Sequence, residues 1–133
     1  MTFEWADYLA LAKTLKTNAK DQNFLREAQL RSAISRAYYS AFNTAKDYLI
    51  SLGIRFNGSA EVHRDVQNKF ENLSQSERDG TKRLNLVEIS NALGVLRSSR
   101  NKADYEKTVS GIDKKGEAAV IRAEKVYNLI GLL

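Results

Sequence analysis

Residues 30–52 read LRSAISRAYYSAFNTAKDYLISL, and apolar side chains recur along this stretch at intervals of three and four positions. That spacing places them on one face of an α-helix. The pattern holds from about Phe24 to Leu52 and predicts one long central helix, for which Gly53 is a suitable C-terminal cap. The predicted buried face consists of Leu30, Ile34, Ala37, Tyr38, Ala41, Phe42, Ala45, Tyr48, Leu49 and Leu52.

The same periodicity predicts helices on both sides of this one, and the chain contains no proline to interrupt them. A first helix carries an apolar stripe and gives way to a polar connection over residues 17–23. A third helix starts after the turn at residues 57–59, with Ser59 as its N-cap. Residues 79–81 interrupt the helical pattern before a fourth helix, which ends near Tyr105. A loop rich in lysine, glycine and serine then precedes a fifth helix. The predicted inward residues are Trp5, Tyr8, Leu9, Ala12 and Leu15; then Val62, Val66, Phe70 and Leu73; then Leu86, Ile89, Leu93 and Leu96; and finally Ala119, Val120, Ala123, Val126, Tyr127 and Ile130.

Amphipathic helices joined by short turns favour an all-α fold, an antiparallel up-down bundle of four main helices plus a fifth, in a single domain over residues 1–133. Small side chains recur along the central helix, at Ala33, Ala37, Ala41 and Ala45. They would let another helix approach closely. That helix could belong to the same chain or to a second copy.

Composition excludes several classes of function. The 133 residues contain no cysteine and a single histidine, His63, so we expect no disulfide, no metal site and no cofactor. No apolar run is long enough to cross a bilayer, and the first residues lack a signal-peptide pattern, so the expected location is the cytoplasm, without a membrane partner. The net charge of +5 favours anionic partners such as nucleic acid.

The apolar seam of the predicted fourth helix becomes charged at its end. Continued past Leu96, it reaches Arg100 and then Asp104, and Arg97 and Asn101 share that side. An arginine on a core stripe requires a carboxylate partner or an anionic ligand. The cluster is therefore either an ion pair, with Asp104 and with Asp47 or Glu88 as further partners, or a ligand site. Arg36 presents the same alternatives, because it could pair with Asp47 or Asp104 or face Arg100 across a cleft.

Two motifs carry a resemblance to a known family. The segment Ser35-Arg36-Ala37-Tyr38-Tyr39-Ser40-Ala41-Phe42 and the segment Arg100-Asn101-Lys102-Ala103-Asp104-Tyr105 resemble the HEPN domains of prokaryotes, in the branch with an Arg-x-x-Ala-Asp-Tyr signature. These small helical proteins are frequent in defence and toxin–antitoxin systems. The order of the predicted helices also matches, so the resemblance covers nearly the whole chain.

The resemblance implies a homodimer in which the two signature segments face each other across a cleft. In catalytic members this cleft is a metal-independent ribonuclease site, built from an arginine followed after four to six residues by a histidine. No histidine follows Arg100 in this chain, and Asp104 stands in its place. A carboxylate with a reference pKa of about 3.9 accepts a proton at neutral pH but has none to donate.

The sequence therefore predicts a binding component of a defence or toxin–antitoxin module. Its partners would be a minimal nucleotidyltransferase, RNA, or both, bound through Arg36, Tyr39, Arg97, Asn101 and Lys102. The alternative is a metal-independent ribonuclease with Arg100 and Asp104 as catalytic residues, or with His63 brought across the dimer. In some relatives a tyrosine beside the signature receives adenylate from a partner nucleotidyltransferase, and Tyr105 is the matching position.

Overall fold

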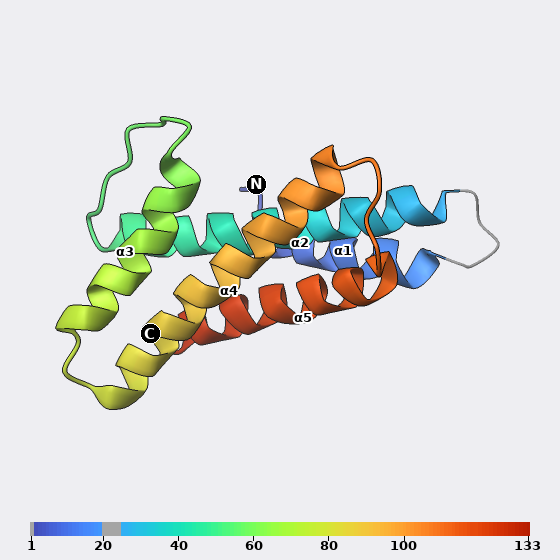
Figure 1. Ribbon diagram of the computed structural model, residues 1–133. Helices are drawn as coiled ribbons and strands as arrows, with labels where there is room; N and C mark the ends of the chain where they lie inside the picture. Colours follow the sequence, from blue (N-terminus) through green and yellow to red (C-terminus); the bar gives the residue numbers. More distant parts are fainter. Residues whose placement is uncertain (1, 20–24) are drawn as a thin grey trace.

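The structure, a computed structural model, describes residues 2–19 and 25–133, and five helices make up most of this part of the chain (Figure 1). Helices α1, α2 and α5 run alongside one another, while α3 and α4 form a hairpin that packs across them (Figure 1). The predicted all-helical fold is confirmed. The helices are α1 (Ala6–Asn18), α2 (Arg26–Ser51), α3 (Val62–Ser76), α4 (Gly80–Tyr105) and α5 (Ile112–Gly131).

Helix α2 lies at the centre of the bundle and contacts all four other helices. Its four regularly spaced alanines are at most 1% exposed within the single chain, so neighbouring helices of the same chain cover them. Alanine at these positions lets the backbones of neighbouring helices approach without a cavity between them. The small residues therefore serve packing within the chain and do not form a dimer seam.

The end of α2 follows the predicted cap. Gly53 has a φ of +88°, a conformation that glycine adopts without the steric cost of a side chain. Its N–H donates to the Ile50 carbonyl at 2.9 Å, and the Ile54 N–H donates to the Leu49 carbonyl at 3.1 Å, which completes a Schellman motif. Leu52 was predicted to be buried and is instead 51% exposed, because the helix ends there.

Two other boundary predictions differ from the structure. Ser59 is not the N-cap of α3, since the helix begins at Val62 and Ser59 lies in the turn before it, where its hydroxyl accepts from the Glu61 N–H at 3.3 Å. The break predicted over residues 79–81 is instead the first turn of α4, whose N-cap is Asp79. The Asp79 carboxylate accepts from the Thr81 and Lys82 N–H groups at 2.9 and 3.2 Å.

On α5, the buried face is narrower than predicted. Tyr127 is 46% exposed, because it lies one position beyond the buried Val126 and so about a quarter turn around the helix. Two predictions lie outside the described residues: the start of the central helix at Phe24, and residues 20–23 of the first connection. In the described ranges, no helix combines the length and apolar character that crossing a lipid bilayer requires.

Candidate functional site

Arg100 is held from several sides near the end of α4. Its Nε lies 3.3 Å from Asp104 Oδ2, one helical turn further along, so the predicted ion pair is formed. One terminal nitrogen donates to Asn101 Oδ1 at 2.6 Å and the other donates to the Tyr39 hydroxyl of α2. The side chain is only 13% exposed. The guanidinium therefore has its charge balanced inside the chain.

The other carboxylates considered as partners of Arg100 are engaged elsewhere. Asp47 accepts a hydrogen bond from the Trp5 indole N–H at 2.8 Å, and Glu88 lies 3.4 Å from the Lys125 ammonium. These contacts leave Asp104 as the carboxylate that pairs with Arg100.

Aromatic rings surround the Arg100 guanidinium. Its central carbon lies 5.1 Å from the ring centroid of Tyr39, 5.6 Å from that of Tyr38 and 5.8 Å from that of Tyr105. Burial by itself would lower the pKa of Arg100, but the Tyr39 hydrogen bond and the Asp104 charge outweigh it and hold this pKa above its usual range. The group stays protonated at every physiological pH.

Arg36 approaches the same tyrosine. Its guanidinium lies 5.4 Å from the Tyr39 ring centroid and 4.8 Å from that of Tyr8 on α1. Arg36 forms no ion pair with Asp47 or Asp104, which are both within the described residues, so the predicted salt bridge is wrong. The half-buried Tyr39 thus contacts two arginines, Arg36 of α2 and Arg100 of α4, and Arg36 in turn contacts α1.

His63 comes to this cluster from α3 of the same chain. Its Nδ1 lies 2.5 Å from the Tyr38 hydroxyl, and its ring stacks on Phe42 with centroids 4.3 Å apart. Burial lowers the pKa of His63, and the positive charges of Arg100, Arg97 and Lys46 lower it further. The imidazole is therefore neutral at pH 7. Burial also raises the pKa of Tyr38, so its hydroxyl remains protonated.

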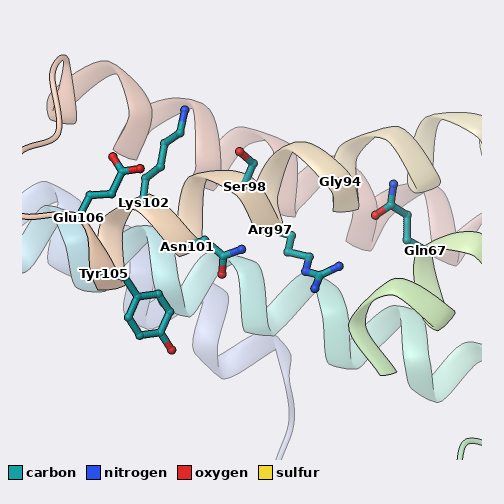
Figure 2. A pocket seen from close by; sticks show the side chains of 8 residues that line it. All are labelled: Gln67, Gly94, Arg97, Ser98, Asn101, Lys102, Tyr105 and Glu106. Carbon is teal, nitrogen blue, oxygen red and sulfur yellow. The ribbon is translucent and has the colours of Figure 1, made fainter. Parts of the chain in front are cut away.

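A groove of about 600 Å³ runs over the last turns of α4 beside α3. Arg97, Asn101 and Tyr105 extend to one side of α4, and Ser98 and Lys102 extend to the other (Figure 2). Neither Arg97 nor Lys102 forms an ion pair with any residue that the structure describes. We call this the α4 groove, and its lining consists of Gln67, Gly94, Arg97, Ser98, Asn101, Lys102, Tyr105 and Glu106.

Gly94 allows α3 to come close to α4 at one end of the α4 groove. A Cβ atom at this position would lie 2.7 Å from Gln67 Nε2, closer than two such atoms can approach. The glycine thus makes room for the Gln67 amide to reach the groove (Figure 2).

The end of α4 is anchored by an arginine that was not among the predicted site residues. Arg31 of α2 donates from Nη1 to the carbonyls of Ala103 and Glu106 at 2.9 and 2.6 Å, and from Nη2 to that of Lys107 at 3.1 Å. A cation at a helix C-terminus satisfies carbonyls that have no partner within the helix. Arg31 therefore fixes the position of the helix end that carries Asp104 and Tyr105.

A second hollow, of about 420 Å³, lies on the α2 side of Asp104. Ser35 donates from its hydroxyl to Asp104 Oδ2 at 3.4 Å, so this carboxylate has a second contact besides Arg100. The hollow is lined by Ala28, Arg31, Ser32, Ser35, Arg36, Ala103 and Asp104. Asp104 thus borders this hollow while it pairs with Arg100.

Comparison with family models matches the HEPN domain over residues 10–133. The chain belongs to the HEPN domain family. No curated protein and no solved structure matches the chain. The two sequence motifs that carry the resemblance meet in this HEPN fold, since Tyr39 of the first contacts Arg100 of the second.

The predicted site residues of this HEPN domain fall into two groups. Arg36, Tyr39, Arg100, Asn101 and Asp104 form one connected cluster, and Arg97, Asn101, Lys102 and Tyr105 line the α4 groove. Arg31 and Gln67 were not among the predicted site residues. His63 was considered only in the ribonuclease alternative, as a residue brought across a dimer, and it already lies against Tyr39 within one chain, with ring centroids 6.2 Å apart. Among the described residues, no group of three or more histidine or acidic side chains could hold a metal ion.

Proposed function

We propose that this HEPN chain is a binding component of a prokaryotic defence or toxin–antitoxin module and that its α4 groove binds RNA phosphates. The observation that carries the proposal is the contrast between its arginines. Arg100 is neutralised by Asp104, whereas Arg97 and Lys102 line the groove without an acidic partner among the described residues. Unpaired cations on one surface bind the phosphate backbone and release its counterions.

The other groups of the α4 groove suit the same ligand. The amides of Gln67 and Asn101 can pair with the edges of unstacked bases, and Tyr105, 76% exposed, offers a ring on which a base can stack. Glu106 also lines the groove and weakens its positive potential. We therefore expect a site for single-stranded RNA of moderate affinity.

The proposal includes a homodimer, as the family resemblance implies. Two α4 grooves facing each other would double the number of free cations along one RNA strand. Sedimentation velocity on the intact protein tests this part, with a dimer expected at micromolar concentration and a monomer contradicting it.

A minimal nucleotidyltransferase is the proposed protein partner, with Tyr105 as the acceptor of adenylate. The Tyr105 oxygen would attack the α-phosphate of ATP, form the new O–P bond and release pyrophosphate, with the phenolic proton passing to solvent. The exposure of this ring supports the proposal. Co-expression with the enzyme followed by intact-mass analysis should give one adenylate, which Tyr105→Phe abolishes and Tyr127→Phe, at another exposed tyrosine, leaves in place.

Fluorescence anisotropy with a labelled single-stranded RNA in EDTA, over a series of salt concentrations, tests the RNA proposal. Arg97→Ala and Lys102→Ala should each weaken binding and reduce the slope of log K against log salt by about one. Arg83→Ala, an exposed arginine near the other end of α4, is the matched control for lost charge. Equal effects of all three variants would show that the α4 groove is not the site.

A second candidate function, a metal-independent ribonuclease, is favoured by one observation. His63 is neutral and is held beside the Arg97 and Arg100 charges in the same chain. A neutral imidazole can accept a proton from a ribose 2′-hydroxyl while an arginine stabilises the phosphate charge. Asp104, the other predicted catalytic residue, is already paired with Arg100. Gel analysis of the RNA in the same EDTA samples decides this question, because cleavage lost in both Arg100→Ala and His63→Ala would assign the activity to this cluster.

A further inference from the structure

A third polar cavity lies on the far side of α3 from the α4 groove. Its volume is about 430 Å³, within the range of small-ligand sites. One wall is the loop that follows α2, and the other is the outer face of α3, where residues 65, 68, 69 and 72 recur at helical spacing. The lining consists of Ile54, Arg55, Phe56, Asn57, Asp65, Asn68, Lys69 and Asn72.

The loop wall of this cavity is held in place by the fold. The Schellman motif at the end of α2 fixes Ile54, and both Ile54 and Phe56 pack against the hydrophobic core. Asn57 Oδ1 accepts from the Ser59 N–H at 3.1 Å, which orders the turn into α3. A ligand would therefore meet a cavity that is already formed.

Apart from Asn57, the polar side chains of the cavity have no partners among the residues that the structure describes. Arg55, Asp65 and Lys69 form no ion pair there, although they line the same cavity, and the amides of Asn68 and Asn72 form no hydrogen bond. By contrast, Arg64 and Glu61, on the same helix turn but outside the cavity, lie 3.3 Å apart in an ion pair. The cavity thus gathers two cations, a carboxylate and two amides whose hydrogen-bonding capacity remains for a ligand.

We infer that this cavity binds a ribonucleotide unit. Asparagine amides can pair with the edge of a base, which presents donors and acceptors side by side. The half-buried ring of Phe56 offers an apolar surface for the same base. Arg55 and Lys69 suit the phosphate, and the Asp65 carboxylate suits a ribose hydroxyl, which is a hydrogen-bond donor. A bare anion could accept hydrogen bonds from the amide N–H groups, but it would leave the amide oxygens without a donor and would be repelled by Asp65.

The inference extends the proposed function, because an RNA strand that leaves the α4 groove across α3 would reach this cavity. The same ribonucleotide chemistry could also come from a free mononucleotide. The two sources differ in whether a single nucleotide is sufficient for binding, so both are tested.

The experiment uses the intact ¹⁵N-labelled protein and follows the side-chain amide resonances of Asn68 and Asn72. The protein is titrated separately with AMP, a short oligoadenylate and inorganic phosphate. Asn68→Ala/Asn72→Ala, which changes no charge, should weaken binding of the responding nucleotide about tenfold, the loss of one good base contact, with the affinity of this variant taken from the backbone amide resonances of the cavity residues. Asn91→Ala, an exposed asparagine on α4, is the matched control and should leave the affinity unchanged.

A response of these resonances to AMP, or to oligoadenylate alone, supports the site and identifies its source. No response to either nucleotide overturns it, as does an equal response to inorganic phosphate, which would reveal an anion site only. Oligoadenylate binding that depends on Arg97 but leaves Asn68 and Asn72 unaffected overturns this inference and keeps the α4 groove. A response to AMP without any Arg97-dependent RNA binding supports this cavity and overturns the α4 groove as the RNA site.

Discussion

Arg31→Ala, a change on α2, should destabilise the end of α4 more than most other single substitutions. The arginine donates three hydrogen bonds to carbonyls at this helix end, of which the one to Ala103 at 2.9 Å is partly buried and the other two are exposed. A hydrogen bond from a charged donor contributes about 1.5–3 kcal/mol when buried and much less in water. We take about 2 kcal/mol for the Ala103 contact and roughly 0.5 kcal/mol for each exposed one, so the free energy of unfolding should fall by about 3 kcal/mol.

Urea denaturation followed by circular dichroism measures this loss. With a slope of about 1–3 kcal/mol per molar urea, the midpoint should move down by roughly 1 M or more. Hydrogen exchange of the Glu106 amide, which donates to the Lys102 carbonyl at 3.0 Å, should accelerate more than exchange in α1. Arg83→Ala, near the start of α4, should change stability by less than about 0.5 kcal/mol.

Arg31→Lys separates geometry from charge. An ammonium keeps the charge but cannot form the same fork of contacts, so this variant should recover only part of the lost stability. An Arg31→Ala protein with the wild-type urea midpoint and unchanged exchange at Glu106 would refute the view that Arg31 anchors α4.

Three further changes test other parts of the structure. His63→Gln should flatten the pH dependence of stability in acid. Folding lowers the pKa of His63 from 6.5, so the unfolded chain binds more protons and the wild type loses stability as the pH falls below about 6.5. Urea midpoints at several pH values measure this dependence. Gly94→Ala should leave stability within about 1 kcal/mol of wild type, since alanine favours the helix while its Cβ displaces the flexible Gln67 amide. The displaced amide leaves its place at the α4 groove, so fluorescence anisotropy should show weaker RNA binding. Asp79→Ala should cost about 1 kcal/mol through loss of the α4 N-cap, measured by thermal unfolding.

Local features of this chain were predictable from its sequence, and contacts between distant segments were not. The Arg100–Asp104 pair follows from a spacing of four on one helix, and the Gly53 cap follows from the point where an apolar pattern stops. Ser59 was misplaced because serine accepts a backbone hydrogen bond equally well in a turn and at an N-cap, so its type does not fix where the helix starts.

The contacts that complete the candidate site depend on how the helices cross. Arg31 reaches carbonyls more than seventy residues further along the chain, and His63 reaches Tyr38 across the whole α2–α3 loop. Neither residue belongs to a motif or breaks a periodic pattern. Their roles appear only once α2, α3 and α4 are packed together.

The ion pair between Arg100 and Asp104 has a consequence for selectivity. An anion that binds this guanidinium must displace a carboxylate that carries one negative charge and already lies 3.3 Å away. An internal phosphodiester also carries one charge and gains little by the exchange. The internal phosphates of a strand are therefore left to Arg97 and Lys102, which line the α4 groove without an acidic partner among the described residues.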